Sequence, residues 1–209
     1  MFIEAALFFA TIIVHNEMEN LVISQDQPKF VSPGRNNIAW IDSPNLSDRP
    51  EGTVVDTIVL HHTAGSSLSG TVKWFEMPES QVSAHYTIGK AGDIVQQVST
   101  WKRAWHAGNS IDSLGRSNVN NFSVGIEIVN LGNGIDPYTP EQVEAVTLLV
   151  THLSTRRFPI KYIVSHEYIA EPAGRKNDPI NYPWDSLKPL AERKNIQLIF
   201  GRKDQQKPK

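Results

Sequence analysis

Two apolar runs rich in β-branched residues restrict most strongly the folds open to this chain of 209 residues. One occupies residues 54–60, and the other, SVGIEIV, occupies residues 123–129. Runs of this kind are typical of strands that are buried on both faces of a sheet. They therefore favour a sheet that is covered by helices.

Helical patterns alternate with further strand patterns along the chain. The clearest helix begins at Thr139, where Pro140 takes the first helical position and Gln142 completes a capping box. Its apolar stripe comprises Val143, Val146, Leu149, Val150 and Leu153. We also predict helices over residues 67–75 and 184–193, the latter interrupted at Pro189, and strands over 85–89, 94–98 and 162–164. The expected fold is α/β (α+β), a single domain with a central mixed β-sheet flanked by helices.

The two ends of the chain differ in composition from its centre. Residues 1–14 are mostly apolar but too few for a membrane-spanning helix, which needs ~20 residues. Their length suits a signal peptide, yet no basic residue precedes Lys29, so an export signal and an N-terminal helix both stay open. Residues 25–52 are interpreted as an irregular arm and 201–209 as a polar tail. We divide the chain into an N-terminal segment and arm (1–42), one domain (43–195) and a tail (196–209).

Composition narrows the classes of partner and chemistry. Lys plus Arg number 20 against 22 for Asp plus Glu, a formal net charge of −2 that does not favour nucleic acid as a partner. Cysteine is absent, which excludes thiolate catalysis, disulfides and cysteine metal ligands. Cysteine content does not fix the compartment, and we slightly favour the cell envelope or the exterior over the cytoplasm. We expect a monomer with no stable membrane span.

Histidines and one aspartate follow the strand patterns. His61 and His62 close the first apolar run, His166 follows a later strand, and Asp178 lies in the segment RKNDP. Neighbouring strands bring their C-terminal ends together at one edge of a sheet, so these residues can meet there. Adjacent side chains on a strand point to opposite faces, so only one of His61 and His62 faces a shared ion easily. Two imidazoles and a carboxylate suit one zinc ion with a position left for water. A hydrogen-bonded histidine at the core edge is the alternative for each ring taken alone.

Two charged residues are candidates for catalysis. Glu127 lies between two isoleucines, where burial raises the pKa of a carboxyl and suits a general base; a salt bridge or a solvent-facing strand edge is the alternative. Pro179 favours an extended conformation at Asp178, so Lys176 and Asp178 share a face. Lys176 would then stand beside the ion and stabilise an oxyanion. An ordinary surface charge cluster is the alternative.

Four further residues are candidates for contact with a substrate. Trp105 and His106 lie in the loop-like segment WHAGNS, which suits the lining of a groove or a plain turn. His85 lies on a predicted strand, where a satisfied core histidine is the alternative. If His61 faces the ion, His62 takes a supporting or substrate-contacting role. We assign substrate binding to His62, His85, Trp105 and His106.

Taken in order, these motifs resemble the zinc-dependent N-acetylmuramoyl-L-alanine amidases of the type-2 amidase superfamily, which also includes the peptidoglycan recognition proteins. The matching segments are IVLHHTA at 58–64, VSAHY at 82–86, WHAG at 105–108, VGIE at 124–127, His166 and RKNDP at 175–179. The resemblance covers residues 43–190, and the lead-in SPN and RPEG looks most like the branch that processes cell-wall turnover fragments.

The resemblance implies an amidase/peptidoglycan-recognition-like fold that hydrolyses the amide bond between N-acetylmuramic acid and L-alanine in peptidoglycan or muropeptides. It implies that His61, His166 and Asp178 bind one zinc ion, the family's third ligand being Asp or Cys. It also implies that Glu127 is the catalytic glutamate and Lys176 the catalytic lysine. Two alternatives stay open: a non-catalytic peptidoglycan-binding module and a different zinc amidohydrolase.

Overall fold

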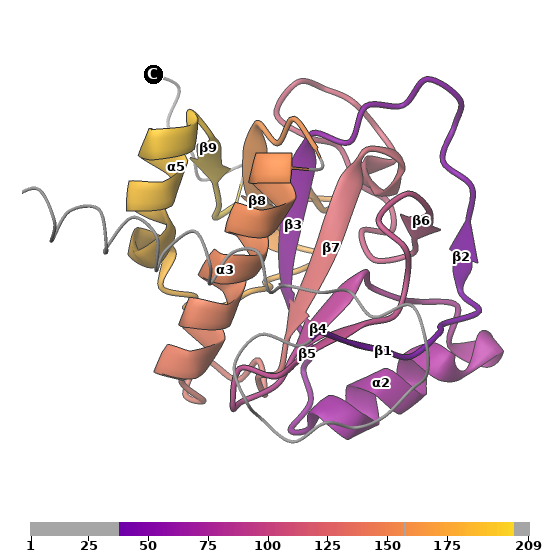
Figure 1. The fold of residues 1–209 in the computed structure, drawn as a ribbon, viewed down its shortest axis with the longest axis vertical. Coiled ribbons are helices and arrows are strands. Elements are labelled where there is room, and N and C mark those ends of the chain that lie inside the picture. The colour runs from indigo at the N-terminus through magenta and orange to yellow at the C-terminus, as the bar shows by residue number, and fades with distance from the viewer. Residues whose placement is uncertain (1–37, 157, 203–209) are drawn as a thin grey trace, which may run out of the picture.

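The computed structural model describes residues 38–156 and 158–202, which form one domain around a seven-stranded sheet (Figure 1). The strand order is β1-β5-β4-β7-β3-β8-β9. In chain order these strands are β1 (Ile38–Trp40), β3 (Thr57–His62), β4 (Tyr86–Ile88), β5 (Ile94–Gln96), β7 (Ser123–Ile128), β8 (Tyr162–Ser165) and β9 (Gln197–Ile199). Strands β4 and β5 are antiparallel and the other neighbours are parallel, so the predicted mixed sheet is confirmed.

The helices lie between the strands in sequence, as predicted. They are α2 (Leu68–Glu76), α3 (Pro140–Arg156), α4 (His166–Ile169) and α5 (Lys188–Lys194), with 3-10 turns η1 (Pro78–Ser80), η2 (Val119–Asn121) and η3 (Trp184–Leu187). The capping box of α3 is present, because the Thr139 hydroxyl accepts from the Gln142 amide at 3.1 Å and the Gln142 side chain accepts from the Thr139 amide at 3.1 Å. The helix predicted over 184–193 is η3 followed directly by α5.

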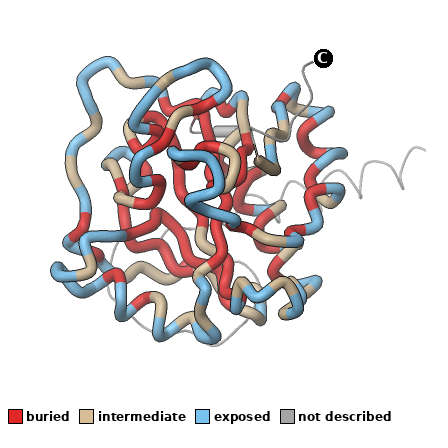
Figure 2. The backbone as a smooth tube through the Cα atoms, turned by 180° about the vertical axis from the view of Figure 1, so that it is seen from behind, coloured by how far each residue is buried: buried red, intermediate tan, exposed pale blue. Residues whose placement is uncertain are grey.

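Alternate residues of the central strands face two different environments. Ile58 and Leu60 belong to the larger core, which also contains the apolar stripe of α3. Val59 belongs to a smaller core beneath η2 and α4. Because side chains alternate along a strand, His61 lies on the face of Val59 and His62 on the face of Leu60. Figure 2 shows the buried strands at the centre of the molecule, surrounded by exposed loops.

Residues 38–52 are an integral part of the fold, which corrects the prediction of an irregular arm over 25–52 for its described part. Residues 38–40 form β1 beside β5, and β2 (Leu46–Ser47) pairs with β6 (Arg103–Ala104) in a second, two-stranded sheet. The Asn45 amide donates to the carbonyls of Met77 and Val82 at 2.9 and 3.1 Å. The Arg49 guanidinium donates to backbone carbonyls of Thr100, Asn120, Asn121 and Ser123. Strands of two or three residues leave no periodic pattern, which explains the error.

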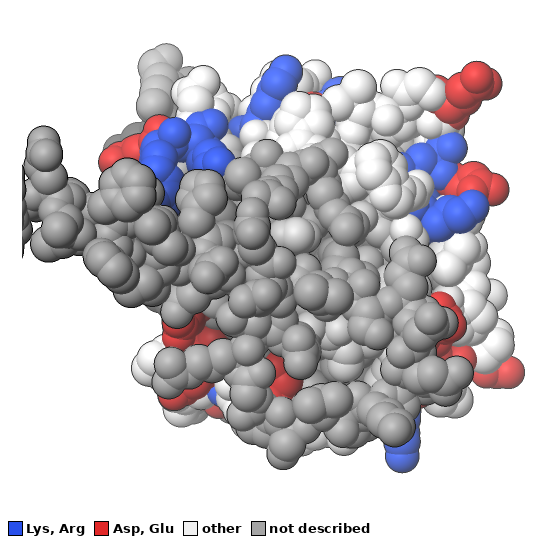
Figure 3. All heavy atoms as spheres, in the orientation of Figure 1, with Lys and Arg blue, Asp and Glu red and all other residues white. Residues whose placement is uncertain are grey.

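Other expectations concern the ends and the surface. The tail assigned to 196–209 contains β9, which pairs with β8. Residues 1–37 and 203–209 lie outside the described residues, so the prediction for the apolar segment 1–14 does too. Among the described helices, none combines the length and apolar character needed to cross a bilayer. On the part of the surface that Figure 3 colours, basic and acidic side chains lie close to one another.

Candidate metal centre

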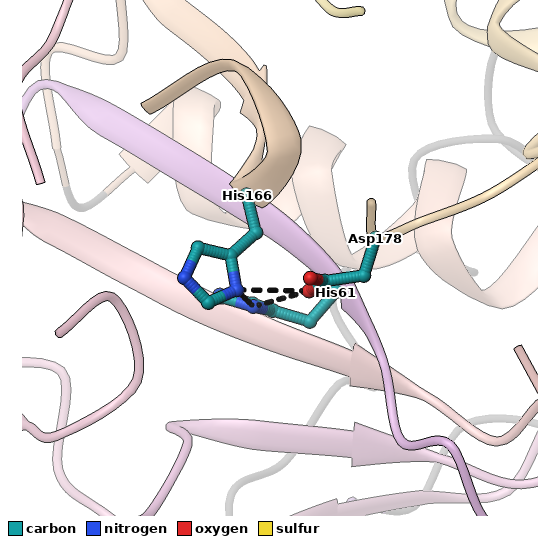
Figure 4. Close-up of side chains that lie close together, drawn as sticks. All are labelled: His61, His166 and Asp178. Atoms are coloured by element: carbon teal, nitrogen blue, oxygen red, sulfur yellow. Dashed lines mark hydrogen bonds and ion pairs between the residues drawn. The ribbon is translucent and has the colours of Figure 1, made fainter. Parts of the chain in front are cut away.

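Three side chains from three segments converge at the C-terminal ends of the neighbouring parallel strands β3 and β8 (Figure 4). His61 lies on β3, His166 begins α4, and Asp178 lies in the loop between α4 and η3. The two Nδ1 atoms are 3.0 Å apart, and they lie 3.0 and 2.9 Å from Oδ2 of Asp178. All three residues are buried, and within the described ranges they are the one set of three such residues with ligand atoms inside 4.8 Å of each other.

The topology of the sheet accounts for this convergence. Strands β3 and β8 are parallel neighbours with Leu60 in register with Ser165, so His61 and His166 follow at the same edge. The Ser165 hydroxyl caps α4 by accepting from the Tyr168 amide at 3.1 Å. The amide of Glu167 donates to the Asp178 carbonyl at 2.9 Å, which ties the returning loop to the start of α4.

The three atoms that face one another, the two Nδ1 atoms and Oδ2 of Asp178, can each offer a lone pair to a metal ion. Nε2 of His166 lies 3.1 Å from the Ala107 carbonyl and must donate to it, which leaves Nδ1 as the ring nitrogen that can offer a lone pair to a metal. Burial, more than any other cause, lowers the pKa of His61 to about 4, and this ring is neutral near pH 7. Burial raises the pKa of Asp178, but the adjoining His166 and His61 outweigh it and hold that pKa well below its usual range. A carboxylate and two imidazoles therefore face one small volume.

Glu127 lies next to this cluster on β7, in register with His61 of β3. Its Oε2 atom is buried and has no hydrogen-bond partner within the described structure. Burial raises the pKa of Glu127 to about 8, and the charge of Asp178 adds to the rise while that of Lys176 opposes it. Lys176 is exposed, and its charge also lowers the pKa of His61. The catalytic roles predicted for Glu127 and Lys176 are compatible with these positions.

His62 is buried beside the loop that carries Asp178, whereas Trp105 contacts the β2 segment. Nδ1 of His62 accepts from the Ile180 amide at 3.2 Å. Its ring lies so close to Gly132, at φ +66, that a Cβ atom there would be 2.4 Å from Nε2. Trp105 is half-buried, and its indole donates to the Ser47 hydroxyl at 3.2 Å. The substrate contacts assigned to His62 and Trp105 stay predictions.

His85 and His106, to which we also assigned substrate contact, are buried. Nδ1 of His85 accepts from the Gly125 amide at 3.0 Å, and its Nε2 donates to the Lys102 carbonyl at 3.1 Å. The His106 ring lies between His61 and Ser123, 3.0 and 3.2 Å away. With both nitrogens of each ring engaged, the geometry favours supporting roles over contact with a substrate.

Two polar residues beside the cluster were missed by the sequence reasoning. Asn120 and Ser123 are buried and contact the segment that carries His106. A signal for Ser123 existed, because alternation along residues 123–127 places it on the same face of β7 as Gly125 and Glu127. Asn120 precedes the strand and has no such local signal.

Comparisons with known proteins lead to one family. The family model described as N-acetylmuramoyl-L-alanine amidase matches residues 51–181. The 1,6-anhydro-N-acetylmuramyl-L-alanine amidase AmpD of Citrobacter freundii is 38% identical over 170 residues, covering 72% of this chain and 88% of that relative. N-acetylmuramoyl-L-alanine amidase A of Achromobacter lyticus is 34% identical over 100 residues, covering 47% of this chain and only 51% of that relative. The E. coli amidase AmiD, solved with its substrate anhydro-N-acetylmuramic acid-L-Ala-D-gamma-Glu-L-Lys, has a TM-score of 0.57 at 29% identity, covering 71% of this chain and 61% of that one.

Proposed function

This chain belongs to the N-acetylmuramoyl-L-alanine amidase family, whose reaction is hydrolysis of the amide bond between N-acetylmuramic acid and L-alanine, and we propose that it performs this reaction with one zinc ion. His61, His166 and Asp178 would hold the ion. The observation that carries the proposal is the convergence of their three ligand atoms within 4.8 Å. Muropeptides are the proposed substrate class, in keeping with the relatives named for anhydro-N-acetylmuramyl substrates.

The donor set fits such an ion. Two Nδ1 lone pairs and one carboxylate oxygen face each other with separations of 2.9 to 3.0 Å and are shielded from water. Buried acceptors without donors between them are costly unless a cation or extra protons occupy the space. Two histidines and one aspartate are a ligand set used by catalytic zinc, which, when bound, polarises a carbonyl and acidifies a water molecule.

The chain's own residues supply proton transfer and charge. Glu127, beside His61, takes a proton from the attacking water and passes it to the nitrogen of L-alanine as the carbon–nitrogen bond breaks. Its raised pKa means that it holds this proton readily, and positive charge nearby restores its basic form. Lys176 stabilises negative charge that develops on the carbonyl oxygen. The products are a lactyl carboxylic acid and a peptide with a free amine.

The test is digestion of anhydro-N-acetylmuramic acid-L-Ala-D-gamma-Glu-L-Lys with and without a chelator, with products identified by mass. We expect release of the free peptide, and loss of turnover when zinc is removed. Glu127→Gln should keep zinc but lose at least ~100-fold in turnover, whereas the exposed Glu76→Gln on α2 controls for removal of a carboxyl. Cleavage at another bond would show a different amidohydrolase, and binding without cleavage would show a recognition module. Full turnover by Glu127→Gln would contradict the role given to that residue.

A further inference from the structure

His106 lies directly behind the candidate metal centre. Its Nδ1 atom is 3.0 Å from Nε2 of His61, on the side of that ring away from Asp178. The ring packs on β7 at Gly125, where an added Cβ atom would lie 2.5 Å from Cγ of His106. Glycine at this position therefore lets an imidazole approach the sheet closely enough to reach His61.

The hydrogen bonds behind His61 have one consistent direction. The Ser123 hydroxyl donates its proton to the Val119 carbonyl at 2.7 Å, so it can only accept from Nε2 of His106 at 3.2 Å. The neutral His106 ring then offers a lone pair at Nδ1, which accepts from Nε2 of His61. Nδ1 of His61 is left unprotonated and faces Asp178, which is the form that a metal requires.

Neutrality of His106 follows from its surroundings. The ring is buried, and a buried charge without a partner of opposite sign is costly, so the neutral ring is favoured. His61 and Ser123 contact it, His85 lies 5.8 Å away between ring centroids, and the charges of His166 and Arg49 also act on it. None of these groups is a carboxylate that would favour an imidazolium ion.

The segment that contains His106 and Ala107 also contacts His166, the second candidate histidine ligand. The Ala107 carbonyl accepts from Nε2 of His166 at 3.1 Å. The Asn120 side chain holds the segment in place, because its Oδ1 accepts from the amides of His106 and Ala107 at 3.1 and 2.8 Å. Partners of this kind, beyond the ligands themselves, orient metal-bound histidines and fix their tautomers.

We propose that His106 is a positioning residue of the metal centre: with Ser123 it sets the tautomer of His61, while Asn120 holds the segment that orients both histidine ligands. Substrate recognition is then not the role of His106. The proposal rests on the zinc site proposed above, and it concerns residues that do not touch the ion.

Zinc affinity, measured by competition with a chelating dye, tests this arrangement. His106→Leu leaves the Nε2 proton of His61 without an acceptor, and we expect zinc to bind ~10–100-fold more weakly. His106→Asn places an amide oxygen near the position of Nδ1 and should recover much of that loss. Ser123→Ala should also weaken binding, whereas Ser43→Ala, which removes another buried hydroxyl bonded to a backbone carbonyl, should not.

Failure of the two proposals can be told apart. If the unaltered protein binds no zinc, the metal centre and this inference both fail. If a folded His106→Leu variant binds zinc as tightly as the unaltered protein, only the inference fails. A second measurement needs no variant: imidazole ¹⁵N spectra of the zinc-loaded protein should show His106 protonated at Nε2 alone. Protonation at Nδ1 would overturn the proposed direction of the hydrogen bonds.

Discussion

The buried carboxyl of Glu127 should make the stability of the metal-free protein fall as pH rises, and Glu127→Gln should remove this effect. The pKa of Glu127 is raised from 4.5 to about 8, chiefly by burial. The folded protein therefore keeps a proton that the unfolded chain has already released between these two pH values. Stability from this group is fully present below pH 4.5 and is lost as pH rises to about 8.

The size of the effect follows from the two pKa values. One pH unit corresponds to about 1.4 kcal/mol, so the difference between 4.5 and about 8 corresponds to at most about 5 kcal/mol. His61 and His85 also make stability depend on pH, since burial lowers their pKa values from 6.5 to about 4 and about 3, and the unfolded chain therefore binds protons there that the folded protein does not. They are present in both proteins, so the difference between wild type and Glu127→Gln isolates the carboxyl.

Urea unfolding in the presence of a chelator at pH 5, 7 and 9 measures the effect. The free energy of unfolding of wild type minus that of Glu127→Gln should decrease steadily over this series. A constant offset from replacing a carboxyl by an amide does not affect the slope, and Glu76→Gln serves as the surface control. A difference that stays level from pH 5 to pH 9 would show that Glu127 is not desolvated as described.

Three other outcomes are expected. Gly125→Ala should destabilise the protein by about 1–3 kcal/mol in urea unfolding and weaken zinc binding, because its Cβ would meet the His106 ring at 2.5 Å. Leu153→Ala removes a fully buried side chain of α3 and should cost about 2–5 kcal/mol in the same assay without altering zinc affinity in the protein that stays folded. Asp178→Asn removes the only charged ligand, so dye competition should show zinc binding at least ~100-fold weaker and the digestion assay should show no peptide release.

The main elements of the fold were accessible from sequence because their patterns are long or chemically distinctive. The run ending at His61, the SVGIEIV run and the capping box at Thr139 each carry local information, and the structure has β3, β7 and α3 at these places. Strands β1 and β9 were missed, because three residues at a sheet edge are decided by their neighbours rather than by their own composition.

In the candidate site too, some residues were predictable from sequence and others were not. Chemistry and position along the chain drew attention to His61, His166 and Asp178, which the structure brings together. The surroundings of His106 could not be deduced, since a buried ring between β3 and β7 and an exposed ring in a groove have the same local sequence. Its partner Asn120 acts through two backbone amides, and such contacts depend on tertiary structure alone.

The anchoring of Asn45 and Arg49 has a practical consequence for anyone who shortens this protein. The family match begins at residue 51, just after Arg49, and would be a natural place to start a trimmed version. Such a version would remove the donors to the carbonyls of Asn120 and Ser123, two residues that support His106 behind the proposed metal ligands. On the proposed arrangement it would keep all three candidate ligands and still bind zinc more weakly, so a shortened version should retain Ser43 and the residues after it.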